Sequence, residues 1–367
     1  MTKPQDPLFT PFKLHNLELP NRIVMAPMTR EFSPGGIPGQ DVADYYRRRA
    51  EGGTGLIITE GTTVNDPVAS MSQQIPEFHG EAALAGWKKV VDDVHAAGGK
   101  IFPQLWHVGT ARDQRKAANP DIPSAGPSGL VKPGKQIAEP MTTEHIERVI
   151  QAFADAAADA QRLGFDGVEI HGAHGYLIDQ FFWEGTNQRT DAWGGSMAKR
   201  GRFAAEIIKA VRAATSPEFP IMFRFSQWKQ QDYSARLAQN PQQLLEFLAP
   251  LADAGVDIFH CSTRRYWEPE FDGSDLNLAG WTKELTGKPT VTVGSVGLND
   301  DFFGSFSGQS SETRAFDDLI ERLNSGEFDL VGVGRALLQD PQWANKVRDG
   351  RLNELAPFTA EALSSLS

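Results

Sequence analysis

Short apolar runs alternate with longer amphipathic segments along most of this chain. Eight runs are rich in branched apolar residues, which is typical of buried strands, and each is followed by a segment whose apolar residues recur at helical spacing. The predicted strands cover residues 21–28, 56–60, 101–106, 167–171, 221–225, 257–261, 289–293 and 330–333. The predicted helices cover residues 41–52, 82–97, 142–164, 197–214, 241–254, 277–285, 312–324 and 341–349.

The alternation of strands and helices indicates a parallel sheet, because a parallel connection needs a crossover that is usually a helix. Eight such units predict an α/β fold, a (β/α)8 TIM barrel with extended loops at the C-terminal face of the strands, as a single domain over residues 1–367. The alternative is a doubly wound sheet, but no Gly-x-Gly-x-x-Gly turn follows the first strand.

A barrel of this type takes about 250 residues, so the surplus of the chain must lie in loops. Four long loops follow the C-terminal ends of predicted strands, which is the face where barrel active sites lie. They are His107–Pro140, Phe182–Ser196, Ser226–Asn240 and Ser262–Gly280.

Composition narrows the classes of function. Hydrophobic residues make up 40% and charged residues 23% of the chain, as in a soluble globular protein. The formal net charge of −11 argues against a nucleic-acid or anionic-membrane partner. The single cysteine, Cys261, excludes an internal disulfide framework and a cluster with several thiolates. Residues 1–9 lack the apolar core of a signal peptide and no stretch reaches membrane-spanning length, so we expect a cytoplasmic protein.

Reactive side chains gather just after the fourth predicted strand. His171 and His174 could polarise an oxygen as hydrogen-bond donors, and Tyr176 could transfer a proton, if all three face one pocket. The alternative is a pair of structural histidines and a tyrosine at the rim, since structural polar residues also collect at strand ends.

Glycine-rich turns follow the last two predicted strands. Gly294 and Ser295 follow the seventh strand, and Gly334 and Arg335 follow the eighth. Glycine lets the backbone approach an anion, adjacent N–H groups can hold phosphate oxygens, and arginine adds a bidentate cation. Since phosphate often binds here in barrels, and no metal-ligand cluster is evident, an organic phosphate is indicated, either a substrate or flavin mononucleotide (FMN). Tight turns with a surface arginine are the alternative.

Three further polar residues lie near strand ends and suit a flavin ring. Thr29 could donate to O4, Gln104 could serve the pyrimidine edge, and Arg224 could stabilise negative charge near N1 and O2. Their alternatives are a turn residue, a satisfied core amide and a partner for a barrel carboxylate such as Glu169. Tryptophan rings could form the walls of a pocket for a flat ligand or simply pack in the core; they are Trp106, Trp183 and Trp228.

With these motifs in order, the chain resembles the old yellow enzyme family of FMN-dependent ene reductases over essentially its whole length. The motifs that carry the resemblance are LFTP at 8–11, NRIVMAPMTR at 21–30, HGAHGYL at 171–177, NQRTDAWGGS at 187–196 followed by Arg200 and Arg202-Phe203, and GRALLQDP at 334–341.

The resemblance implies a reaction. NADH or NADPH would reduce FMN, and hydride would then pass from flavin N5 to the β carbon of an α,β-unsaturated carbonyl compound or a nitroalkene. His171 and His174 would hydrogen-bond the carbonyl oxygen, and Tyr176 would protonate the α carbon. His174 stands where many members of the family have asparagine, and both side chains can donate to a carbonyl.

The resemblance also implies which residues bind the cofactor and shape the pocket. The flavin ring would contact Thr29, Gln104 and Arg224, with backbone lining from Ala26, Pro27, Met28 and Gly61 and a phosphate site at Gly294, Ser295, Gly334 and Arg335. The substrate pocket would comprise Thr29, Trp106, His171, His174 and Tyr176. No metal is expected. We expect a small-molecule substrate as the partner, with the chain acting as a monomer or homodimer.

The sequence also has to be weighed against other classes of function. The chain could be an FMN-binding or ligand-binding sensor or carrier that does not turn over, although Tyr176 beside two histidines argues against this. We do not expect one of the larger relatives with an iron–sulfur cluster and a second dinucleotide-binding domain, because the sequence has one cysteine and 367 residues. A tRNA-modifying flavin reductase does not suit the acidic balance. The loop Ser226–Asn240 and the segment Arg264–Glu268 match the family least and are expected to set substrate or nicotinamide preference.

Overall fold

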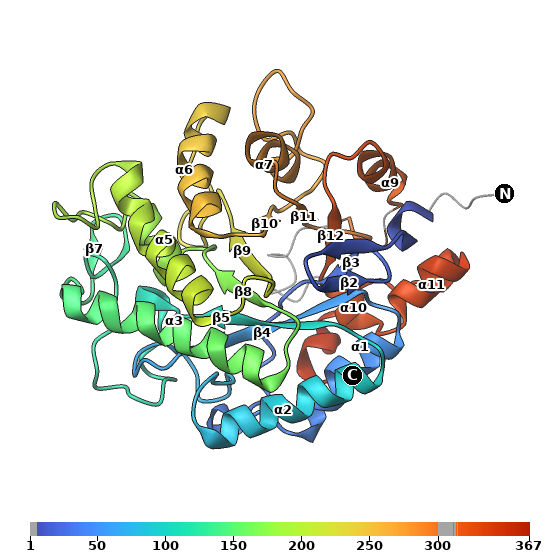
Figure 1. Ribbon diagram of the computed structural model, residues 1–367, viewed down its shortest axis with the longest axis horizontal. Coiled ribbons are helices and arrows are strands. Elements are labelled where there is room, and N and C mark those ends of the chain that lie inside the picture. Colours follow the sequence, from blue (N-terminus) through green and yellow to red (C-terminus); the bar gives the residue numbers. More distant parts are fainter. Residues whose placement is uncertain (1–5, 300–310, 312, 314) are drawn as a thin grey trace.

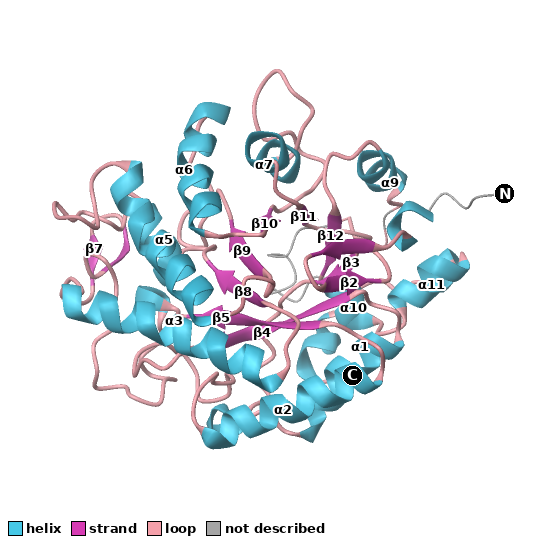
Figure 2. Ribbon diagram, viewed as in Figure 1, coloured by secondary structure: helices cyan, strands magenta, loops and turns pink. Residues whose placement is uncertain are grey.

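A closed barrel of parallel strands forms the centre of the protein. The computed structural model describes residues 6–299, 311, 313 and 315–367. Eight strands pair in the order β10-β11-β12-β3-β4-β5-β8-β9 and close on themselves. Figure 1 shows the helices arranged around these strands, and Figure 2 separates the two kinds of element by colour. The predicted (β/α)8 fold is confirmed.

All eight predicted strands are present, with shifted ends. They are β3 (Ile23–Met25), β4 (Leu56–Thr63), β5 (Ile101–Trp106), β8 (Val168–His171), β9 (Ile221–Phe225), β10 (Ile258–Ser262), β11 (Thr290–Val293) and β12 (Leu330–Val333). Strand β3 ends before Pro27, which has no N–H to continue a ladder. Strand β4 continues past the predicted end through an irregularity between Ile58 and Gly61. Every residue of these strands is buried, which explains their continuous apolar pattern.

The outer helices also match the predicted ones. They are α1 (Gln40–Glu51), α2 (Glu81–Ala96), α3 (Thr143–Leu163), α5 (Met197–Ala214), α6 (Pro241–Ala254), α7 (Leu278–Thr286), α9 (Asp317–Asn324) and α11 (Trp343–Asp349). Side-chain caps fix several starts: Thr142 accepts from the His145 N–H and Asn240 from the Gln243 N–H. Helix α9 covers the second part of the helix predicted at 312–324, of which residues 312 and 314 lie outside the described residues.

Several short elements were not predicted. The antiparallel hairpin of β1 (Phe12–Leu14) and β2 (Leu17–Leu19) packs Leu17 and Leu19 against inward-facing barrel residues such as Phe102 and Met222. A second hairpin, β6 (Leu130–Lys132) and β7 (Lys135–Gln136), lies within the long loop after β5. Helices α4 (Leu177–Phe182) and α10 (Arg335–Gln339) follow β8 and β12. All are too short for a period of 2 or 3.6 to stand out in the sequence.

The last described residues pack on the protein itself. A 3-10 helix covers Ala360–Ser364, and the Arg30 guanidinium donates to the carbonyl oxygens of Ala362 (3.1 Å) and Ser365 (2.6 Å). The C-terminal end lies beside α1 (Figure 1), whose Arg48 and Arg49 donate to further backbone carbonyls there. None of the described helices combines the length and apolar content needed to cross a lipid bilayer.

Candidate active site

The three predicted catalytic side chains meet where β8 ends. His171 is the last residue of β8, His174 lies in the following turn with φ of 65°, and Tyr176 precedes α4 as its N-terminal cap. The ring centroid of His171 lies 5.2 Å from that of His174 and 5.2 Å from that of Tyr176. The positive φ at His174 turns the chain back, so that three residues within six positions face one another.

Two tryptophans enclose this trio. The Trp106 ring, at the end of β5, meets Tyr176 edge-on at 4.8 Å and stacks on His171 at 5.9 Å between centroids. The Trp228 ring stacks on His174 at 4.4 Å. Trp183, by contrast, lies at the C-terminal end of α4. The structure therefore brings two of the three candidate wall residues to the predicted site.

Glycine at position 61 makes room for the Trp106 ring. A Cβ atom on Gly61 would lie 2.4 Å from Cε3 of Trp106, a distance that real Cβ atoms do not adopt. Gly61 was predicted as backbone lining for a flavin; the structure shows that its lack of a side chain also lets the Trp106 ring lie against β4.

Both imidazoles are neutral near pH 7. Burial, followed by the positive charge of Arg224, holds the pKa of His171 and of His174 well below 6.5. The Ala173 N–H donates to Nδ1 of His171 (3.3 Å), so the single proton of this ring lies on Nε2. The rings can therefore act as neutral hydrogen-bond donors.

The Tyr176 phenol keeps its proton. Burial raises its pKa above 10, opposed by a hydrogen bond that Gln230 Nε2 donates to the phenol oxygen (2.9 Å). Because the amide donates to the oxygen, the hydroxyl hydrogen is left to point elsewhere.

Inside the barrel, a polar chain joins β5, β8 and β10. Gln104 Nε2 donates to Glu169 Oε1 (2.7 Å), and Glu169 Oε2 lies 2.6 Å from His260 Nδ1. Arg224 instead donates from Nη2 to Ser262 Oγ (3.4 Å), and its Nε is buried without a partner among the described residues. Gln104 therefore is hydrogen-bonded within the core, as the alternative to a flavin contact proposed. Arg224 does not take Glu169 as its hydrogen-bond partner, contrary to the alternative considered for it.

The glycine turns adjoin each other across the β11–β12 pair. Gly294 has φ of 145°, Ser295 has φ of 52°, and Arg335 Nη2 donates to Ser295 Oγ (3.4 Å). A Cβ atom on Gly294 would lie 2.5 Å from the Thr263 carbonyl oxygen, so a side chain cannot fit there. Backbone N–H groups and a guanidinium at neighbouring strand ends suit a phosphate.

The residues at the barrel mouth fit FMN chemically. A buried guanidinium nitrogen without a partner, on Arg224, is what an electron-rich ring edge would satisfy. Thr29 follows β3 and is exposed at the mouth, with Pro27 and Met28 partly buried before it. Ala26 N–H donates to the Val333 carbonyl and so fixes this turn beside the Gly334 turn.

Some residues of the site were not predicted. Ser262, the last residue of β10, has its Oγ 2.7 Å from Nε2 of His174. Gln230 reaches Tyr176 from the loop after β9. Next to it, Lys229 Nζ forms a fully buried ion pair with Asp179 Oδ1 (2.7 Å). The position of Ser262 at a strand end was a signal that could have identified it, whereas nothing in the local sequence distinguishes Lys229 from a solvent-exposed loop lysine.

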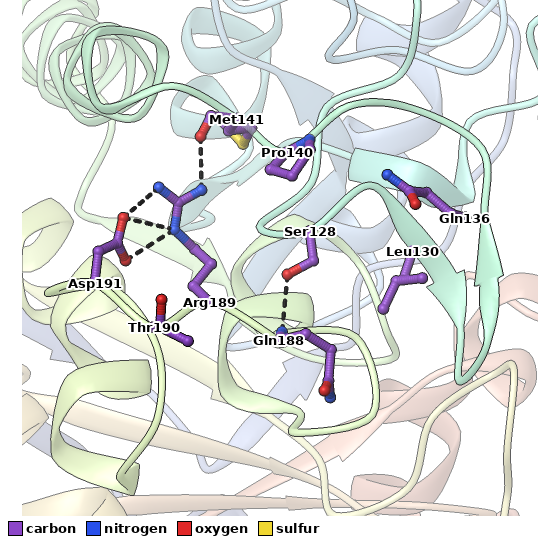
Figure 3. Close-up of a pocket in the computed structure, with 9 residues that line it drawn as sticks. All are labelled: Ser128, Leu130, Gln136, Pro140, Met141, Gln188, Arg189, Thr190 and Asp191. Atoms are coloured by element: carbon purple, nitrogen blue, oxygen red, sulfur yellow. Dashed lines mark hydrogen bonds and ion pairs between the residues drawn. The ribbon is translucent and has the colours of Figure 1, made fainter.

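An open cavity of about 500 Å3 lies elsewhere, between the β6–β7 hairpin and residues 188–191 (Figure 3). Arg189 donates to the carbonyls of Pro127 (2.9 Å) and Met141 (2.6 Å) and pairs with Asp191 (2.6 Å). Ser128 Oγ accepts from the Gln188 N–H (2.8 Å). These bonds hold two long loops together, so the 187–196 motif is structural in this part of the protein.

Within the described ranges, no group of three or more His, Cys, Asp or Glu side chains is arranged to hold a metal ion.

Comparisons with known proteins agree with this geometry. The profile of the NADH:flavin oxidoreductase / NADH oxidase family matches residues 7–354. The chain is 36% identical over 359 residues to an NADH oxidase of Thermoanaerobacter brockii, covering 95% of this chain but 52% of that protein, so it spans about half the length of this relative. It is 33% identical over 362 residues to 12-oxophytodienoate reductase 7 of Oryza sativa subsp. japonica, covering 94% of this chain and 88% of that protein.

Solved structures give the same picture. Morphinone reductase in complex with tetrahydroNAD superposes with a TM-score of 0.78 at 29% identity, covering 94% of this chain and 90% of that chain. The old yellow enzyme homologue from Zymomonas mobilis superposes with a TM-score of 0.80 at 26% identity, covering 97% and 96%.

Proposed function

The chain belongs to the NADH:flavin oxidoreductase / NADH oxidase family, and from this premise we propose that it is an FMN-dependent ene reductase. Its substrates are α,β-unsaturated carbonyl compounds or nitroalkenes, and its reductant is NADH or NADPH. The observation that carries the proposal is the meeting of His171, His174 and Tyr176, two neutral donors and one protonated phenol, between Trp106 and Trp228.

The residues at the barrel mouth would hold the cofactor. Gln104, Arg224 and Thr29 would contact the ring, Gly294, Ser295, Gly334 and Arg335 the phosphate, and Ala26, Pro27, Met28 and Gly61 the intervening surface. When bound, FMN would supply the hydride, taken from the nicotinamide, that the β carbon of the substrate receives.

The side chains of this protein orient and polarise the substrate. The Nε2–H of His171 and an N–H of His174 hold the carbonyl oxygen as negative charge develops there. Donors placed at such an oxygen commonly lower the barrier by ~3 kcal/mol each. Because both rings are neutral, they donate hydrogen bonds to the carbonyl oxygen without transferring a proton. The proton that the α carbon needs comes from another group.

Tyr176 supplies that proton. Its hydroxyl stays protonated at neutral pH, and the Gln230 amide that donates to its oxygen favours the phenolate left after transfer. Trp106 packs on both Tyr176 and His171 and keeps water from this side of the trio. A proton donor supported in this way favours turnover over a pocket that only binds a ligand.

Tyr176→Phe tests the proposal. The variant should slow alkene reduction by about 10²-fold or more, because general acid catalysis commonly contributes 10²–10⁴-fold. Reduction of bound FMN by NADH or NADPH should stay within about twofold, since that step needs no proton from Tyr176. Stopped-flow absorbance with cyclohexenone separates the two half-reactions. Equal loss in both would refute the proton-donor assignment, and protein that cannot be loaded with FMN would refute the whole proposal.

Several further properties remain predictions from the sequence. These are the single domain over residues 1–367, the cytoplasmic location, the lack of nucleic-acid and membrane partners, the monomeric or homodimeric state and the use of NADPH or NADH as the reductant.

A further inference from the structure

A short polar chain runs from Arg224 through Ser262 to His174. Arg224 Nη2 lies 3.4 Å from Ser262 Oγ, which lies 2.7 Å from Nε2 of His174. Strand register explains the arrangement, because Arg224 pairs with His171 in β8 on one side and with His260 in β10 on the other. Ser262 therefore follows two positions after the residue opposite Arg224, at the mouth of the barrel.

The direction of each hydrogen bond in this chain follows from chemistry. A guanidinium can only donate, so Arg224 uses a lone pair of the serine oxygen. The serine hydroxyl hydrogen then needs an acceptor. Ser262 is only 3% exposed, and a buried hydroxyl that makes no such hydrogen bond would cost about 1–3 kcal/mol. The neighbouring Nε2 of His174 is that acceptor, and a neutral imidazole with an accepting Nε2 carries its proton on Nδ1.

The His174 ring is held in place around this bond. Trp228 stacks on it at 4.4 Å between centroids and itself donates from Nε1 to the Ser262 carbonyl oxygen (3.1 Å). The backbone N–H of His174 donates to Ser226 Oγ (3.0 Å). His174 is only partly buried, and its Nδ1 makes no hydrogen bond with a described residue, so this nitrogen is available to a ligand in the pocket.

We propose that Ser262 is a positioning residue that, with Arg224, fixes the ring proton of His174 on Nδ1. The two imidazoles then take opposite tautomers, and a substrate oxygen is held by Nε2–H of His171 and Nδ1–H of His174. The backbone amide of Ala173 sets the first tautomer, and the Ser262 hydroxyl sets the second. The identity of the oxygen as a carbonyl rests on the proposed function; the tautomer does not.

Loss of the hydroxyl has a defined consequence. In Ser262→Ala, Nε2 of His174 loses its donor, so the ring proton can move to Nε2 and the lone pair of Nδ1 then faces the substrate oxygen. The pocket loses one donor and gains a repulsive contact. Ser262→Thr keeps a hydroxyl at the same position and should restore the original state.

The first test reads the tautomer directly. Nitrogen-15 NMR of histidine-labelled, FMN-loaded protein distinguishes protonated from unprotonated ring nitrogens, and His174→Asn assigns the signal. We expect Nδ1–H in the wild type, in Ser262→Thr and in the control Ser124→Ala, which removes another buried serine hydroxyl. Ser262→Ala should show Nε2–H or a mixture of tautomers. Nε2–H in the wild type, or unchanged Nδ1–H in Ser262→Ala, would overturn the proposal. The wild-type spectrum decides even if a variant does not fold.

The second test measures what the tautomer does to binding. The dissociation constant of FMN-loaded protein for a simple phenol, read from its charge-transfer absorbance, should rise about tenfold in Ser262→Ala and return to near the wild-type value in Ser262→Thr. An unchanged constant in Ser262→Ala would also count against the proposal. If the tautomers behave as expected but no alkene is reduced, the proposed function fails and this inference stands. If alkenes are reduced but the tautomers do not respond to Ser262, the reverse holds.

Discussion

Charge at the mouth of the barrel is set residue by residue through burial and immediate neighbours. His171 and His174 are kept neutral beside the cationic Arg224, while Tyr176 is kept protonated. Each group therefore stays in the protonation state that its proposed role requires.

Glu60 is a buried carboxyl outside this set, and it predicts a measurable pH effect. Burial raises its pKa from 4.5 to about 7, although its Oε2 accepts the backbone N–H groups of Arg30 (2.8 Å) and Glu31 (3.1 Å). Because the pKa of Glu60 is higher in the folded than in the unfolded state, this group contributes fully to the stability of the folded protein below about pH 4.5. The contribution is lost as pH rises through about 7. The difference in free energy of unfolding between Glu60→Gln and the wild type should therefore be more favourable to the variant at pH 8 than at pH 5, by roughly 1–3 kcal/mol. Urea denaturation at both pH values checks this, and a wild-type-to-variant difference that does not change with pH would contradict it.

Gly61 offers a test of packing at the pocket wall. Gly61→Ala places a methyl group 2.4 Å from Trp106 Cε3, so the ring must move. Overpacking of this kind typically costs 1–3 kcal/mol. Gly201→Ala is the matched control, because its Cβ meets open space within helix α5 and should stabilise the protein by about 0.5–1 kcal/mol. Equal effects of the two substitutions on urea denaturation would show that the Trp106 contact is not tight.

At the residue scale, sequence predicted side chains that are close along the chain and missed those that are not. His171, His174 and Tyr176 lie within six positions, so their chemistry could be seen in one motif. Ser262 is 88 residues from His174 and Gln230 is 54 residues from Tyr176. Such contacts depend on strand register and loop path, which no local pattern specifies.

At the scale of elements, the loop after β9 is fastened to the catalytic segment. Lys229 forms a backbone bridge with His174, and its ammonium pairs with Asp179 in α4. Asp179 Oδ2 also accepts the Gly175 N–H (2.8 Å). This ion pair therefore holds Gln230 over Tyr176. It also fixes the position of the loop Ser226–Asn240, which matched the family least.

Lys229→Met should be strongly destabilising. The substitution leaves the Asp179 carboxyl in a fully buried site without its cation, and breaking one side of a buried pair typically costs 3–5 kcal/mol. Lys88→Met, which removes the exposed Lys88–Asp92 pair on α2, should cost less than about 1 kcal/mol. Urea denaturation of the two variants compares them, and similar losses would mean that the buried pair does not hold the loop.

Helices and strands were predicted correctly where burial requires a continuous run of apolar residues or a long apolar face. Strands such as Ile221–Phe225 are apolar runs between turn residues, and helices such as Thr143–Leu163 have a capped start and a long apolar face. The β1–β2 hairpin has three residues in each strand, too few for alternation to be recognised. Its role in covering inward-facing barrel residues could be seen only once the barrel had closed.

At the scale of the whole molecule, repeated strand–helix units predicted the barrel because each unit leaves an apolar strand that must be buried on both faces, and eight such units are the number that closes a barrel. The four long loops and both glycine turns then fall at the same mouth. This is why residues in or after β3, β4, β5, β8, β9, β11 and β12 could be predicted to form one site before any distance was known.

The buried histidines predict how stability of the whole protein depends on pH. Burial lowers the folded-state pKa of His171, His174 and His260 below the ordinary 6.5. The unfolded chain therefore binds more protons as pH falls below about 6.5, and each histidine can remove up to about 1.4 kcal/mol of stability per pH unit until its folded-state pKa is reached. Glu60 acts in the opposite direction, and so do Asp179 and Glu270, whose carboxyl pKa values are also raised by burial.

The contribution of one histidine is therefore read by comparing a variant with the wild type. The free energy of unfolding of His174→Asn relative to the wild type, measured with urea at a fixed FMN concentration, should rise by up to about 1.4 kcal/mol as pH falls from 6.5 to 5.5. A difference between the two proteins that does not change over this interval would show that His174 is not held neutral, and the account of it as a neutral donor would fail with it.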